Sequence, residues 1–163
     1  MKEVLSMSVE AVKEYLKPFG LSNQVLELAE SSATVELAAQ AVGCESARIA
    51  KTLSFAVDGG CVLIVCAGDA KIDNPKFKAQ FHTKATMLTP DQVLAYTGHA
   101  VGGVCPFGVT NPDVTTYLDV SLKRFDIVYP AAGNAASAVR LTCDELSELS
   151  NSAGWIDVCK NWA

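Results

Sequence analysis

Residues 49–67 read IAKTLSFAVDGGCVLIVCA, and this stretch decides the fold. Two apolar runs flank Asp58-Gly59-Gly60, which is a strong turn signal. The pattern predicts a β-hairpin with strands at 49–57 and 61–67. Lys51 stands near the start of the first strand, where burial among apolar neighbours would cost its ammonium group hydration. A lysine in this position suggests a site that needs a cation.

Helix and strand signals mix irregularly on both sides of the hairpin. Two capping boxes, at 89–92 and 142–145, predict helix starts, and glycine or proline ends most of the helical patterns. The predicted helices run from Ser8 to about Pro18, from Thr34 to Gly43, over 74–81, from Thr89 to Gly98 and from Thr142 to about Leu149. The other predicted strands cover 25–28, 116–120, 126–129, 138–141 and 155–159.

Strands outnumber helices in this pattern, and the two do not alternate as in a doubly wound fold. The sequence therefore predicts an α+β protein with one domain over residues 1–163. Its expected core is a mixed, curved, barrel-like sheet flanked by helices. With 163 residues, half of them hydrophobic, the chain can bury such a core.

The formal net charge of -5 argues against a general nucleic-acid binder, and no DNA partner is expected. Residues 71–84 nevertheless form a basic window, in which four lysines outnumber one aspartate. This window could contact RNA phosphates, or it could be a solvated lysine face. The lysines are Lys71, Lys76, Lys78 and Lys84.

The six cysteines include no C-x-x-C pair, and the chain has only two histidines, so we expect neither a structural zinc site nor another metal or cofactor. Most of the cysteines fall in apolar runs, as small hydrophobes do. The N-terminal residues lack the pattern of a signal peptide, and no apolar stretch approaches membrane-spanning length. These features predict a reduced, cytoplasmic protein without a membrane partner.

A glycine-rich segment, Gly102-Gly103-Val104-Cys105-Pro106-Phe107-Gly108, follows the helix that ends at Gly98. A turn of this composition can bring bare backbone N–H groups close to a ligand. Facing a lysine, these donors would suit a phosphate, a carboxylate or a developing oxyanion. The alternative is a plain connector, because glycine-rich loops are common and this one carries no phosphate-binding fingerprint.

In order and rough spacing, five segments resemble the YbaK/EbsC family, which includes the editing domain inserted into bacterial prolyl-tRNA synthetases and its free-standing relatives. The resemblance spans about Thr34 to Leu149. The segments are Ala50-Lys51-Thr52-Leu53, Gly68-Asp69, Gly102–Gly108, Asp119-Val120-Ser121-Leu122 and Ala131-Ala132-Gly133. The resemblance implies a curved, barrel-like α/β domain that hydrolyses mischarged aminoacyl-tRNA in trans, with a small wrong amino acid on tRNA(Pro) as the expected substrate and prolyl-tRNA synthetase as a possible partner.

The resemblance also assigns roles to residues. Lys51 matches the essential lysine of the family, and the family's G-x-x-x-P loop matches Gly102, Gly103, Val104, Cys105 and Pro106. Thr34, Val35, His99, Phe107 and Gly108 are expected to bind substrate. An aminoacyl ester is already activated, so the chemistry needs a positioned water or ribose hydroxyl and stabilisation of the oxyanion. Lys51 would hold the terminal phosphate or ribose as a point charge.

Two other functions fit the same residues. The first is a non-catalytic module that binds tRNA ends or a small ligand, or regulates a partner. The second is a thiol enzyme or redox sensor centred on Cys105, activated by Lys51 with His99 nearby. Each of these residues could also have a purely structural role. Lys51 could be a strand residue whose ammonium snorkels to the surface, Cys105 a small residue in the pocket wall, and His99 a structural histidine. Asp69 and Asp119 are expected to serve turns or caps.

Overall fold

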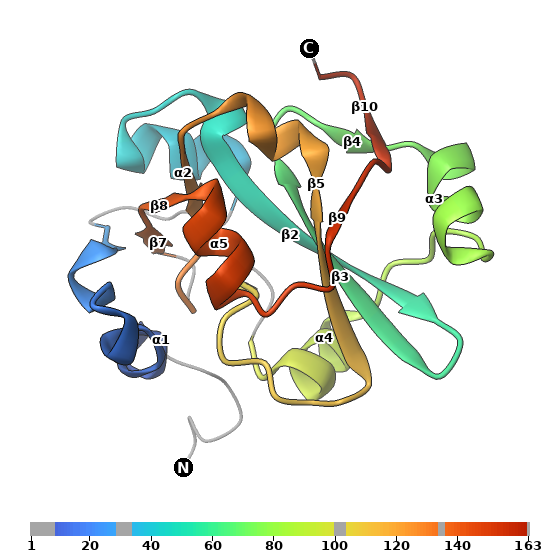
Figure 1. Ribbon diagram of the computed structural model, residues 1–163, viewed down its shortest axis with the longest axis horizontal. Helices are drawn as coiled ribbons and strands as arrows, with labels where there is room; N and C mark the ends of the chain where they lie inside the picture. The colour runs from blue at the N-terminus through green and yellow to red at the C-terminus, as the bar shows by residue number, and fades with distance from the viewer. Residues whose placement is uncertain (1–8, 29–33, 100–103, 134–135, 163) are drawn as a thin grey trace.

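The computed structural model describes residues 9–28, 34–99, 104–133 and 136–162, and a curved mixed sheet lies at its centre (Figure 1). Within these residues the six strands of the sheet lie in the order β8-β6-β2-β3-β5-β9. They comprise β2 (Ile49–Val57), β3 (Gly60–Ala67), β5 (Val114–Asp119), β6 (Ile127–Pro130), β8 (Leu141–Thr142) and β9 (Trp155–Ile156). The predicted α+β class and the curved sheet are both confirmed.

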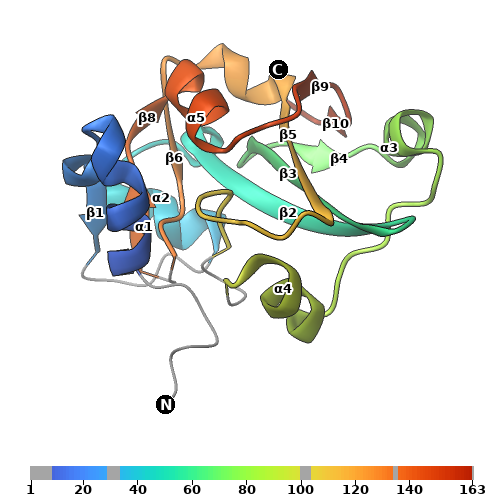
Figure 2. The ribbon, with the colours of Figure 1, turned by 60° about the horizontal axis from the view of Figure 1, so that its bottom comes forward.

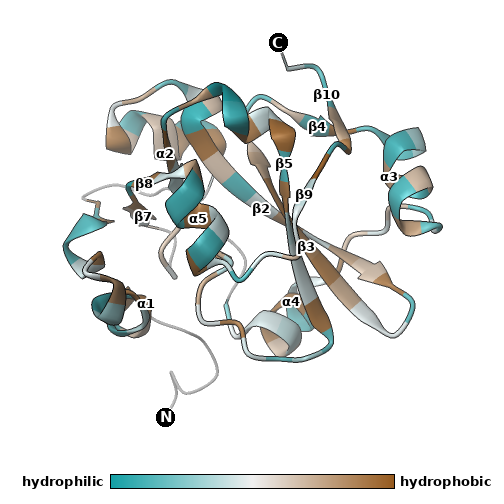
Figure 3. Ribbon diagram, in the orientation of Figure 1, coloured by the Kyte–Doolittle hydropathy of each residue, from teal (hydrophilic) through white to brown (hydrophobic). Residues whose placement is uncertain are grey.

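The predicted hairpin is β2–β3, an antiparallel pair in which Lys51 lies opposite Cys66. β5 continues the sheet parallel to β3, and β6 is parallel to β2. Strand β3 is buried on both faces, as the unbroken apolar run from Cys61 to Ala67 requires. Figure 3 shows this hydrophobic character along β3, in contrast to the hydrophilic outer sides of α3 and α5.

The outer edge of β2 is only partly paired, and this detail positions the site. Strand β6 pairs with β2 at Ile49 and Ala50 only. Further along, the backbone N–H of Ala56 donates to Thr86 O (2.8 Å) and that of Leu88 donates to Ser54 O (3.2 Å). Residues 51–53 lie between the part of β2 that pairs with β6 and the part that bonds to residues 86–88.

Five α-helices surround the sheet in the described residues, and Figure 2 shows α4 and α5 on opposite sides of the β2–β3 hairpin. Both predicted capping boxes are present, at Thr89 with Gln92 and at Thr142 with Glu145. The Thr34 hydroxyl caps its helix by accepting from Leu37 N, whereas Ser8 lies outside the described residues. The helices are α1 (Val9–Leu16), α2 (Val35–Val42), α3 (Asn74–Phe81), α4 (Pro90–Thr97) and α5 (Cys143–Leu149).

Two predicted strands are each split in the structure. The segment predicted at 138–141 forms β7 (Ser137–Val139), which pairs with β1 (Val25–Glu27), and the separate strand β8. The segment predicted at 155–159 forms β9 and also β10 (Cys159–Lys160), which pairs with β4 (Lys71–Ile72). In both cases the chain changes partner within one predicted strand, and residue periodicity carries no signal of such a change.

The core on one face of the hairpin is built around Phe77 of α3. Its ring is fully buried, and its centroid lies 5.0 Å from that of Phe55 and 4.7 Å from that of Phe81. Asp119 is also fully buried, and its carboxylate accepts from the backbone N–H groups of Ser121 and Val158 (both 2.9 Å). The predicted capping role of Asp119 is confirmed, and its second bond ties β5 to the C-terminal segment.

We expect Phe77→Ala to lower the free energy of unfolding by about 3–5 kcal/mol, because it leaves a cavity beneath α3. Urea unfolding followed by circular dichroism measures this change. Phe19→Ala is the matched control, since Phe19 is 45% exposed and its truncation should change stability by less than about 0.5 kcal/mol. Equal effects of the two substitutions would contradict this account of the core.

Candidate functional site

A cavity of about 420 Å³ runs along the partly paired edge of β2. Most of its wall is apolar and comes from α2, α4, β2 and the segments that follow β6. Of the residues expected at a site from the sequence, it brings together Thr34, Val35, Lys51 and Val104. The other lining residues are Ala38, Ile49, Ala50, Thr52, Leu53, Ser54, Met87, Leu88, Pro90, Val93, Tyr129, Ala131, Ser137 and Ala138.

The ammonium group of Lys51 is held by the turn between β3 and β4. Its Nζ donates to Ala70 O (2.5 Å) and lies 3.4 Å from Gly68 O. A side chain at Gly68 would collide with the backbone just before β2 and with the start of α2, because its Cβ would lie 2.0 Å from Ser46 O and 2.8 Å from Val35 Cγ1. The absence of a side chain at Gly68 thus lets this turn pack against α2 and present its carbonyls to Lys51.

Asp69, in the same turn, forms a two-pronged ion pair with Arg124. Arg124 Nη1 donates to Asp69 Oδ2 (2.9 Å), and Arg124 Nη2 donates to Asp69 Oδ1 (2.6 Å). The Arg124 hydrogen bonds hold the pKa of Asp69 below its usual value, and the nearby charge of Lys51 contributes in the same direction. Arg124 is itself fixed by a bond to Ser121 O (2.9 Å) and by the ring of Trp162. The sequence identified Asp69 as a turn residue but gave no sign of its partner.

The lowered pKa of Asp69 makes its contribution to stability depend on pH. A carboxyl group whose folded-state pKa is depressed stabilises the fold above its unfolded-state pKa, about 4, and loses this effect as pH falls through the folded-state value. We therefore expect wild type to be more stable than Asp69→Asn at pH 7, with the difference shrinking below about pH 4. Urea unfolding of both proteins between pH 7 and pH 2.5 tests this. A difference that stays constant across the range would contradict it.

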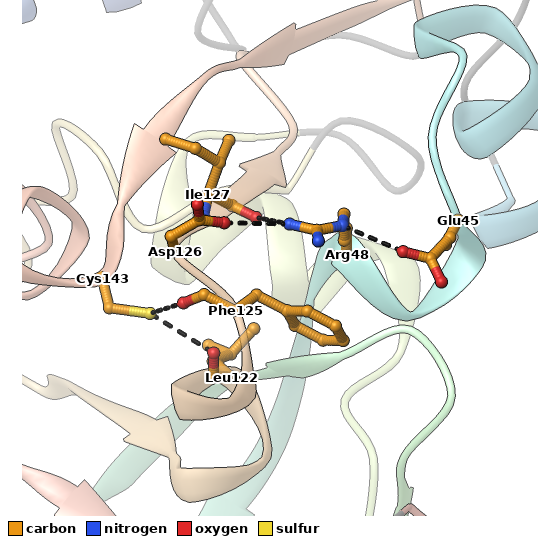
Figure 4. Close-up of polar contacts among 7 residues, drawn as sticks. All are labelled: Glu45, Arg48, Leu122, Phe125, Asp126, Ile127 and Cys143. Carbon is orange, nitrogen blue, oxygen red and sulfur yellow. Dashed lines mark hydrogen bonds and ion pairs between the residues drawn. The ribbon is translucent and has the colours of Figure 1, made fainter.

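A second arginine, Arg48, packs with Arg124 on the ring of Phe125. The guanidinium of Arg48 is 4.9 Å and that of Arg124 4.8 Å from the centroid of the Phe125 ring. Arg48 pairs with Glu45 (3.1 Å) and Asp126 (3.2 Å), and the Cys143 thiol donates to the backbone nearby (Figure 4). These carboxylates are largely exposed, so the pairs around Arg48 contribute little to stability.

The segment after α4 is organised by His99 and Cys105, both fully buried. His99 Nε2 lies 3.0 Å from Phe107 O and 3.5 Å from Cys105 Sγ. A carbonyl oxygen only accepts hydrogen bonds, so Nε2 carries a proton and cannot take one from the thiol. Burial raises the pKa of Cys105 to about 12 and lowers that of His99, which keeps both groups neutral.

These contacts argue against the thiol-enzyme hypothesis. Cys105 is near His99, as that hypothesis requires, but the imidazole has the wrong tautomer to act as its base. Nor does Cys105 line the cavity, and Lys51 donates its hydrogen bonds elsewhere. Cys105 packs as a small core residue, and His99 fixes the backbone at Phe107.

We expect iodoacetamide to leave Cys105 unmodified in the folded protein at pH 7.5, because its thiol is buried and protonated. Cys44 and Cys143, which are partly exposed, should react first. Peptide mass spectrometry after timed labelling gives the order of reaction. Preferential modification of Cys105 would restore the thiol hypothesis.

The remaining predicted residues do not meet in the cavity. Phe107 and Pro106 are buried, Gly108 sits in a turn with φ of 72°, and none of these three lines the cavity. Gly102 and Gly103 lie outside the described residues. The four lysines of the basic window are exposed on or near β4 and α3, away from the cavity lining, and Lys76 is paired with Asp157 (3.0 Å).

Several lining residues were given no site role from the sequence. Tyr129 lies in β6, which pairs with the start of β2, and Ala131 follows β6; Ser137 and Ala138 lie in β7, which pairs with β1. The described residues contain no cluster of three His, Cys, Asp or Glu side chains arranged to hold a metal. Among the helices described, none is long and apolar enough to cross a membrane.

Comparison with known proteins identifies the class. The model of the aminoacyl-tRNA editing domain matches residues 29–149, and the chain belongs to this family of editing domains. The sequence-based recognition of the YbaK/EbsC type is thereby confirmed. A solved structure with a TM-score of 0.84 and 32% identity, covering 95% of this chain and 99% of the other, is that of a candidate trans-editing enzyme for prolyl-tRNA synthetase.

Among curated proteins, the chain is 54% identical to the uncharacterized protein YwhH of Bacillus subtilis, over 96% of this chain and 99% of YwhH. It is 29% identical to EbsC of Enterococcus faecalis, a candidate Cys-tRNA(Pro)/Cys-tRNA(Cys) deacylase, over 75% of each chain. Proline–tRNA ligase of Solidesulfovibrio magneticus is 32% identical over 77% of this chain but only 21% of the ligase.

Proposed function

We propose that this protein hydrolyses mischarged aminoacyl-tRNA in trans and that its substrate carries a small, wrong amino acid on tRNA(Pro). The observation that carries the proposal is the position of Lys51. Lys51 lines an apolar cavity of suitable size for an aminoacyl group, and the 68–70 turn holds its ammonium, in a chain of the editing-domain family. We take residues 1–163 to act as one such domain.

In the proposed mechanism, the amino-acid side chain occupies the apolar part of the cavity near Ala38 and Val104. Lys51 holds the terminal phosphate or ribose of the tRNA as a point charge. The backbone N–H of Val104, the described residue of the 102–108 segment that lines the cavity, stabilises the oxyanion that forms when water, assisted by a ribose hydroxyl, attacks the ester carbonyl. No side-chain nucleophile is needed, which agrees with the buried, protonated state of Cys105.

The rest of the tRNA would contact the four exposed lysines of the basic window and Lys51. Each phosphate contact releases counterions, so binding should weaken steeply between about 50 mM and 200 mM salt. Prolyl-tRNA synthetase is a candidate partner that could deliver the substrate, since the family's domain also occurs within proline–tRNA ligases.

The test is deacylation of a panel of aminoacyl-tRNAs by the purified protein. The panel carries alanine, cysteine, serine and threonine, each on tRNA(Pro) and on its cognate tRNA, with spontaneous hydrolysis measured in parallel. Loss of one or two esters well above the spontaneous rate supports the proposal and identifies the substrate. If no ester is lost while tRNA still binds at low salt, the protein is a binding module.

A further inference from the structure

We infer that the exposed backbone of Thr52 binds the aminoacyl group itself, by pairing with it as one residue of a neighbouring β-strand would. This inference rests on the proposed function and specifies how its substrate is recognised. The ligand class is an α-aminoacyl ester, recognised by its α-ammonium group and its carbonyl oxygen rather than by its side chain.

The direction of the Thr52 backbone groups follows from the hydrogen bonds of its neighbours. In a strand, the N–H and C=O of one residue point to the same side, and the side alternates along the chain. Ala56 N and Ser54 O both bond to residues 86–88, on the side of β2 away from β3. Thr52 is two positions from Ser54 and four from Ala56, so its N–H and C=O also point away from β3.

These two groups open into the cavity. Lys51, Thr52 and Leu53 all line it, although consecutive side chains of a strand point to opposite faces. Three adjacent residues can share one cavity wall only if the cavity follows the strand edge. Thr52 has no backbone partner among the described residues, and its buried Oγ1 also lacks a hydrogen-bond partner there.

The gap in the edge fits a single residue. On one side Ala50 is paired with Pro130, and on the other Ser54 O accepts from Leu88 N. A peptide strand needs several free positions to pair, and this edge offers only residues 51–53. An aminoacyl group requires one position, because its amine and carbonyl flank a single Cα, as they do in a strand residue.

The chemistry of the two partners is complementary. Thr52 N–H donates to the ester carbonyl, and the substrate α-ammonium donates to Thr52 C=O in a charge-assisted bond. The carbonyl oxygen keeps a second lone pair for another hydrogen-bond donor. Recognition by backbone groups selects for the α-amino acid unit, whatever its side chain. The apolar wall of the cavity then limits which side chains fit.

The test uses two stable amide analogues of the tRNA end, 3′-deoxy-3′-(L-alanylamido)adenosine and its propionylamido counterpart, which lacks only the amine. Binding to the full chain is followed by ¹H–¹⁵N correlation NMR. We expect the alanyl compound to bind about tenfold more tightly, the effect of one charge-assisted hydrogen bond, and to shift the Thr52 amide proton downfield. Equal affinities, or cavity amides that shift while that of Thr52 does not, would overturn the inference.

Two variants separate the backbone from the side chain. Thr52→Val keeps the N–H and should retain the preference for the alanyl compound. Thr52→Pro removes an N–H that points away from β3, and it should weaken binding of both compounds by about tenfold or more. If the proline variant does not fold, the Thr52 amide shift and the difference in affinity between the two analogues still test the inference. Analogue binding without deacylation of any tRNA in the panel would refute the proposed hydrolysis but leave this inference standing.

Discussion

Replacing Lys51 with methionine is expected to lower the rate of aminoacyl-tRNA deacylation by about 10²–10³-fold, the typical effect of removing one positioned electrostatic group from a site. Methionine keeps most of the length of the side chain and removes the charge, so the donated bonds to Ala70 O and Gly68 O are lost together with the contact to substrate. Single-turnover deacylation of the best substrate in the panel measures the change.

The control for this variant is Lys17→Met, which removes one exposed lysine just after helix α1 and leaves the cavity untouched. It should retain the wild-type rate within about twofold, because an exposed surface charge away from the site has little effect. Circular dichroism and urea unfolding establish that both variants are folded. A Lys51→Met protein that is folded and fully active would refute the mechanism proposed for this residue.

Asp69→Asn is expected to lower the same rate by about 10- to 100-fold although Asp69 does not line the cavity. The substitution breaks the pair with Arg124 that fixes the 68–70 turn, and this turn supplies both carbonyl partners of Lys51. Small displacements of a positioned group can cost this much. Asp69 and Arg124 are therefore positioning residues, which act through Lys51.

A double-mutant cycle distinguishes this role from a general loss of structure. If Asp69 acts through Lys51, adding Asp69→Asn to Lys51→Met should cause little further loss of activity. The matched control is Asp126→Asn, which breaks the pair with Arg48 beside the ring of Phe125 and should leave the rate unchanged. Effects of Asp69→Asn and Lys51→Met that multiply, or equal effects of Asp69→Asn and Asp126→Asn, would show that Asp69 is only structural.

Local patterns in the chain predicted the elements that depend on local chemistry. The β2–β3 hairpin follows from two apolar runs around Asp58-Gly59, and both capping boxes form because their partners are three residues apart. The short strands were harder to predict. Strands β7 and β8, and likewise β9 and β10, divide one predicted strand between different partners, and the choice of partner is a long-range property.

The same distinction applies to the site. Lys51 stood out because a cation in a strand-forming apolar run is costly, and Thr34 and Val35 were expected at the site by resemblance. His99, Cys105 and Phe107 form one cluster, but that cluster is core, and burial rather than residue type makes Cys105 inert. Nothing in the sequence paired Asp69 with Arg124, which are 55 positions apart.

By itself, the sequence determined the fold class and the family and singled out Lys51 as a candidate site residue, because hairpins, helix caps and a charge within an apolar run can be recognised from neighbouring residues. Only the tertiary structure decided which carbonyls hold that lysine and that the cavity follows an edge of β2 left open at residues 51–53. The physical reason is that both depend on contacts between distant parts of the chain. The 68–70 turn is fixed by the pair of Asp69 with Arg124, and the open edge depends on where β6 stops pairing with β2 and where the 86–88 segment begins to pair.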